Sequence, residues 1–160
     1  MTDHEMSPLF ALAAALAYMI QSDADPSIQE KAEFLTVFGK LLVSDEMSKG
    51  QVERLTRESF DYATKTPLPA FIKKITSKLT VAQKLAMLVN LYDTMLVDGV
   101  VNDVERSVFR DFQRAFLVDE KTVRIIREIL MLRNDISLFI NPSHPFNNDD
   151  FDLAHLLRGK

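Results

Sequence analysis

A short acidic segment carries the residues of this sequence that are best suited to chemistry. Residues 98–105 read DGVVNDVE, with a carboxylate at each end and a glycine that permits a sharp turn. Hard cations such as Ca²⁺ and Mg²⁺ are bound by several carboxylate and carbonyl oxygens that converge on one point. The spacing from Asp98 to Glu105 therefore indicates oxygen ligands for a divalent cation. Zinc suits these ligands less well.

The segment is not a complete EF-hand. The two earlier ligand positions of that loop would fall on Thr94 and Leu96, and a leucine side chain cannot ligate a cation. A second acidic segment lies 75 positions earlier, with Asp23 and Glu30 at the same spacing of seven. We therefore expect a split site that takes oxygen ligands from both segments.

The match between the two halves extends beyond the acids. The aligned pairs are Asp23 with Asp98, Ser27 with Asn102, Glu30 with Glu105 and Phe34 with Phe109. In each half an apolar helix, a short loop that opens with Asp, a capping residue and a second apolar helix follow one another. Internal repetition of this kind predicts two pseudo-symmetric helix–acidic loop–helix units.

A purely structural interpretation of the same acids stays open. Glu30 and Glu105 each stand three residues after a capping residue, where a carboxylate completes a capping box and favours the helix dipole. Asp23 and Asp98 follow helix ends, where aspartate commonly forms turns. Capping alone, however, does not require a matched Asp seven residues before each Glu.

The elements that must position these residues are all helical. Caps and apolar residues at helical spacing predict an all-α bundle of about seven helices, and no stretch alternates like a strand. The expected ranges are 8–21, 27–43, 49–63, 68–79, 81–97, 103–116 and 120–134. The predicted starts are Ser7-Pro8, Ser27, Ser48, Thr66-Pro67, Thr80, Asn102 and Asp119.

The chain is expected to hold one helical domain, residues 1–135, and an acidic and aromatic tail, residues 136–160. Leu9 to Ile20 is apolar throughout but shorter than the roughly 20 residues of a spanning helix, so we interpret it as the buried central helix. No basic signal-peptide start precedes it, which favours the cytoplasm and no membrane insertion. The tail must pack on its own domain or on a partner, so a tail-exchanged homodimer is worth testing.

Composition excludes several function classes. The chain has no cysteine, which rules out disulfides and thiolate metal sites. A net charge of −4 argues against nucleic acid as a partner. His144 and His155 flank three tail aspartates, but a zinc site needs more nitrogen ligands at firmer spacing. No nucleophile elbow or phosphate-binding glycine loop is present. We therefore predict that the chain is not an enzyme.

The duplicated acidic loop resembles that of the TerB family of tellurite-resistance proteins, and the DjlA co-chaperone family has a related helical domain. The resemblance covers roughly Leu9 to Leu132. It implies an all-α fold, acidic residues proposed to bind metal ions, and a role in tellurite or stress response through protein complexes. By position the acidic residues are Asp23, Glu30, Asp98 and Glu105, although Ala24 replaces the glycine of the first loop.

Three functions are weighed on this basis, in descending order of preference. The first is a cation-responsive scaffold that binds Ca²⁺ or Mg²⁺ at the paired loops and contacts other proteins of a stress-response complex. The second is a metal-free interaction domain whose acidic face docks a basic partner. The third, an enzyme of unknown chemistry, would need a deep pocket lined by acids.

Overall fold

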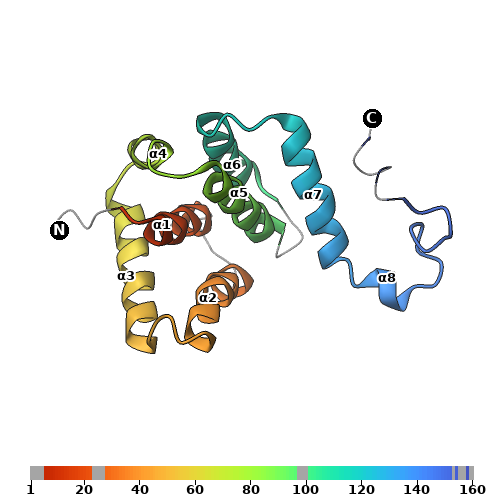
Figure 1. Cartoon of the computed structure of the whole chain (residues 1–160), viewed down its shortest axis with the longest axis horizontal. Helices are drawn as coiled ribbons and strands as arrows, with labels where there is room; N and C mark the ends of the chain where they lie inside the picture. Colours follow the sequence, from red (N-terminus) through yellow and green to blue (C-terminus); the bar gives the residue numbers. More distant parts are fainter. Residues whose placement is uncertain (1–5, 23–27, 97–100, 153, 155–157, 159–160) are drawn as a thin grey trace. The chain divides into compact units, whose positions relative to one another are not determined.

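The computed structural model describes residues 6–22, 28–96, 101–152, 154 and 158, and within these residues the chain forms helices and no strand (Figure 1). The helices are α1 (Pro8–Gln21), α2 (Ile28–Val43), α3 (Lys49–Lys65), α4 (Leu68–Thr76), α5 (Val81–Leu96), α6 (Asp103–Ala115), α7 (Glu120–Asn134) and α8 (Ser137–Ile140). The chain divides into two compact units, Met1–Leu117 and Val118–Lys160. Within the described residues, no helix is long and apolar enough to cross a membrane.

The predicted caps account for where most helices begin. The Ser7 hydroxyl accepts a hydrogen bond from the Phe10 N–H at 3.1 Å, and Pro8 opens α1. Ser48 and Gln51 form a full capping box at α3. Further caps form at Thr80 with Gln83, at Asn102 with Glu105 and at Asp119 with Thr122. Because caps satisfy amide groups that the helix leaves unbonded, they mark helix starts in the sequence. Ser27 lies outside the described residues.

Two local details differ from the prediction. Thr66 does not cap α4: it ends α3, and Pro67 precedes α4 without any side-chain cap. The Thr66 carbonyl instead accepts a 2.6 Å hydrogen bond from the buried Tyr18 hydroxyl. Burial raises the pKa of Tyr18 well above its usual value, so the phenol stays protonated and donates to that carbonyl. The short helix α8 was not predicted.

Helix α1 is the centre of the first unit, as its apolar run predicted. It packs against α2, α3, α5 and α6 (Figure 1). Its buried residues include the alanines Ala11, Ala13, Ala14, Ala15 and Ala17. Alanine lets neighbouring helices approach closely while still removing apolar surface from water.

An aromatic cluster joins the helices around α1. The ring of Phe71, on α4, is completely buried and lies 5.0 Å from Tyr18, 5.7 Å from Tyr62 and 6.2 Å from Phe112, measured between ring centroids. These rings come from α1, α3 and α6. A single side chain on the short α4 therefore ties three other helices together.

The end of α6 carries local backbone strain. Leu117 has a positive φ of 56° and is 90% exposed, so no burial compensates for the left-handed conformation. We expect Leu117→Gly to raise the free energy of unfolding by about 1 kcal/mol, because glycine adopts this conformation without a Cβ clash. Urea unfolding would measure the change. Val43→Gly, at the equally exposed last residue of α2, where φ is not positive, should have the opposite sign; two changes of the same sign would contradict this explanation.

The second unit contains α7, α8 and a hydrogen-bonded turn that follows α7. The Asp135 carboxylate accepts hydrogen bonds from the Ser137 hydroxyl and, at 2.9 Å, from Nε2 of His144. Nδ1 of His144 accepts the Phe146 N–H at 3.0 Å. Both ring nitrogens are therefore used to hold the turn. Serine and histidine both bond to the same aspartate, so the arrangement is not that of a nucleophile activated by histidine.

This turn should loosen in acid. Hydrogen bonds from Ser137 first, and from His144 second, hold the pKa of Asp135 below its usual value. A lowered folded pKa contributes stability above the unfolded pKa, about 3.9, and that stability is lost as pH falls through the folded value. We expect the Ser137 amide resonance to shift in this acidic range. The Asp135→Asn protein should lack that titration; a retained titration would assign it to another group.

Candidate functional site

The structure describes one of the four predicted metal ligands in full. Glu105 is the third residue of α6, directly after the second acidic loop. Asp23, Asp98 and the side chain of Glu30 lie outside the described residues. The convergence of the four carboxylates therefore stays a prediction.

Glu105 is not an ordinary surface cap. Its backbone N–H donates to the Asn102 side-chain oxygen at 2.8 Å, which confirms the cap predicted at Asn102. Its side chain, however, is only 2% exposed. Burial of an ionised carboxylate is costly unless hydrogen bonds or a positive charge compensate for it. A glutamate whose task was only to complete a capping box could do so at the surface.

A second buried carboxylate, that of Asp93, was not predicted from the sequence. Asp93 lies in the last turn of α5 and is 9% exposed. Asp93 lies on α5 and Glu105 on α6, the two helices that precede and follow Asp98 in the sequence. These two helices also pack against each other. The available signal was the sequence itself, since Asp93 interrupts an otherwise largely apolar stretch, residues 91–96.

Within the residues that the structure describes, no group of three or more acidic or histidine side chains is placed to hold a metal ion. Two described carboxylates, Asp93 and Glu105, are both oxygen donors of the kind that Ca²⁺ and Mg²⁺ prefer. Their chemistry fits a hard cation.

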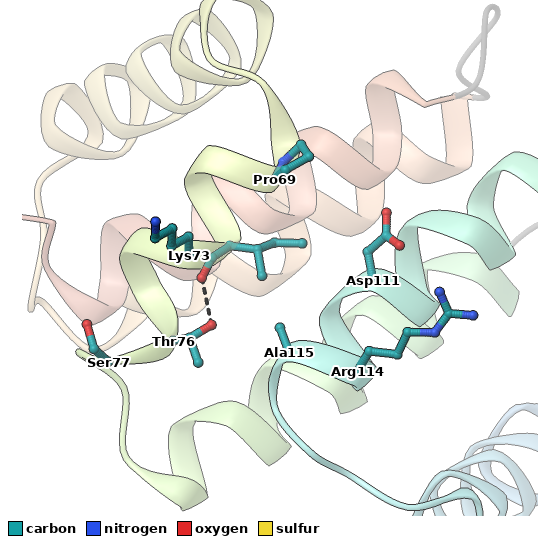
Figure 2. A pocket seen from close by; sticks show the side chains of 8 residues that line it. Pro69, Lys73, Thr76, Ser77, Asp111, Arg114 and Ala115 are labelled. Atoms are coloured by element: carbon teal, nitrogen blue, oxygen red, sulfur yellow. Dashed lines mark hydrogen bonds between the residues drawn. The ribbon is translucent and has the colours of Figure 1, made fainter.

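A different feature is an open groove between α4 and α6 (Figure 2). It encloses about 720 Å³ and is lined by Pro69, Ile72, Lys73, Thr76, Ser77, Asp111, Arg114 and Ala115. Figure 2 shows that the first five come from α4 and its end, and the last three from α6. The sequence could not reveal it, because it depends on how two helices that begin 35 positions apart, at Leu68 and Asp103, are paired in space.

The groove combines an apolar lining with charged edges. The Thr76 hydroxyl donates to the Ile72 carbonyl at 2.6 Å, so this polar group of the lining is already hydrogen-bonded within α4 (Figure 2). Lys73 and Arg114 are exposed, and Asp111 is partly exposed. Asp111 is the single acidic residue among those that line the groove.

Comparison with known proteins bears on most of the first unit and on part of the second. The family profile described as Tellurite resistance protein TerB matches residues 9–128. No curated protein and no solved structure matches the chain. The matched residues span three quarters of the sequence, include both acidic loops and agree with the all-helical fold. The chain therefore belongs to the TerB family of tellurite resistance proteins.

Proposed function

We propose that the chain is a non-catalytic, cytoplasmic scaffold domain of a tellurite or stress-resistance system that binds a divalent cation at its paired acidic loops. Asp23, Glu30, Asp98 and Glu105 supply the oxygen ligands. Ca²⁺ or Mg²⁺ suits these ligands, and the bound ion alters the surface shown to other proteins of a stress-response complex. Family membership supports the cellular role.

The main observation in favour of a bound cation is the burial of Glu105. Glu105 is 2% exposed and follows Asp98 by seven residues in the sequence, and a bound cation is one source of the compensation that a buried charge requires. Two features consistent with the predicted internal repetition add support. Phe34 and Phe109, at equivalent positions of the two halves, are both buried, and α1 packs on α2 as α5 packs on α6.

Titration calorimetry of the metal-stripped protein with Ca²⁺, Mg²⁺ and Zn²⁺ tests this function. We expect saturable binding of Ca²⁺ or Mg²⁺ that weakens at least about tenfold in Asp98→Asn and in Glu105→Gln, a loss of about 1.4 kcal/mol of binding free energy. The glutamine variant separates the two interpretations of Glu105. Gln51 and Gln83 complete capping boxes in this same protein, so glutamine keeps the capping role and removes only the charge.

Glu53→Gln is the matched control, because Glu53 is exposed on α3. It should leave binding unchanged. If none of the three ions binds, the cation-responsive scaffold is wrong and the metal-free interaction domain takes its place, with the acidic face itself contacting a basic partner. Binding that Glu53→Gln weakens as strongly as Glu105→Gln does would point to general surface attraction of cations.

A further inference from the structure

We propose that the groove between α4 and α6 binds an amphipathic helix of a partner protein that presents acidic residues beside its apolar face. None of the eight lining residues belongs to an acidic loop, so this inference does not rest on the cation site. The groove would be the surface through which the domain holds its partner.

The walls of the groove are held in place before any partner arrives. On the buried side of α4, Phe71 contacts Phe112 of α6, and both rings are completely buried. Ile72 and Ile75 anchor α4 further. Because these contacts fix the distance between the two helices, a ligand does not have to order the groove on binding, which favours affinity.

The dimensions suit a helix. From Pro69 to Ser77 the α4 wall rises over eight positions, roughly 12 Å at the usual helical rise. Anchors at positions i, i+3 or i+4, and i+7 of a partner helix span roughly 10.5 Å. A small-molecule pocket buries most of its ligand on all sides. This groove lies open between two helices, so it suits one face of a helix better than a whole small molecule.

The charged residues at the edges of the groove indicate which kind of partner helix would bind. Lys73 stands on the α4 wall and Arg114 on the α6 wall, opposed by the single carboxylate of Asp111 (Figure 2). Residues 68–79 contain three lysines and no acidic residue, in a chain whose net charge is −4. Among the described residues, no ion pair is recorded for Lys73 or Arg114. Acidic residues flanking the apolar anchors would pair with these cations and fix the partner's register.

The test uses the full chain and a synthetic probe. The probe is a fluorescent helical peptide of about 14 residues, roughly four turns, with leucines at i, i+3 and i+7 and glutamates on both sides. A second peptide replaces every glutamate with lysine. Fluorescence anisotropy should show saturable binding of the glutamate peptide, at least about tenfold tighter than the lysine peptide. The double variant Lys73→Glu with Arg114→Glu should reverse this order.

Two further variants locate the binding. Ala115→Arg places a long side chain over the apolar lining and should abolish binding, while circular dichroism confirms that the helices remain. Lys40→Glu, a single charge reversal at an exposed position of α2, should leave binding unchanged. The proposal is overturned if the glutamate peptide does not bind at millimolar concentration, or if neither the Ala115 change nor the double charge reversal alters its binding. Binding of decanoate without binding of the peptide would assign the groove to a small amphiphile and would also overturn it.

Discussion

Phe71→Ala is expected to lower the free energy of unfolding by about 3–5 kcal/mol, the largest effect of any single change considered. The Phe71 ring is completely buried and contacts Tyr18, Tyr62 and Phe112 on three other helices. Its removal takes away apolar burial and leaves a cavity that rigid neighbours cannot fill. The measurement is urea unfolding followed by circular dichroism.

Phe139→Ala is the matched control, because it removes the same ring from a side chain that is 85% exposed on α8. Surface substitutions usually change stability by no more than about 0.5 kcal/mol. Comparable losses at Phe71 and Phe139 would show that the aromatic cluster does not hold the first unit together. Phe71→Ala should also weaken peptide binding at the groove, since this ring fixes one of its walls.

Enlarging the central helix should be nearly as damaging. Ala14 is completely buried in the middle of α1, which packs against four other helices. Ala14→Leu inserts three carbon atoms where close packing leaves no room, and we expect a loss of about 3 kcal/mol, the upper end of the usual 1–3 kcal/mol. Thermal unfolding would show it as a lower midpoint.

Ala86→Leu provides the comparison, because Ala86 is exposed on α5 and leucine is also a good helix former. Its midpoint should stay close to that of the unchanged protein. A midpoint for Ala14→Leu that matches it would mean that α1 has space around it, contrary to the buried alanines of this structure.

The helices could be predicted because their starts are determined locally. A cap such as Ser48 or Asp119 satisfies amide groups within three residues of itself, so neighbouring residues are enough to find it. Helix α8 was missed because its four residues lack a side-chain cap and any helical repeat. Thr66 was misassigned because a helix end and the next helix start fall on adjacent residues.

The candidate site was only partly predictable, because burial depends on distant contacts. The spacing of Asp98 and Glu105 predicts Glu105 as a candidate cation ligand, but no local pattern indicates that this residue is buried. The same pattern fits an exposed cap. Asp93 was overlooked for a related reason: its burial depends on how other helices pack around the last turn of α5.

The alanines of α1 bear on how the amide hydrogens of this helix exchange with solvent. An alanine side chain has no rotamers to lose on folding, so α1 is ordered at little side-chain entropy cost. Its backbone is covered by helices on several sides, so local fraying cannot bring its central amides to water. Those amide hydrogens therefore exchange with deuterium only when the whole first unit unfolds, and their rate reports its global free energy.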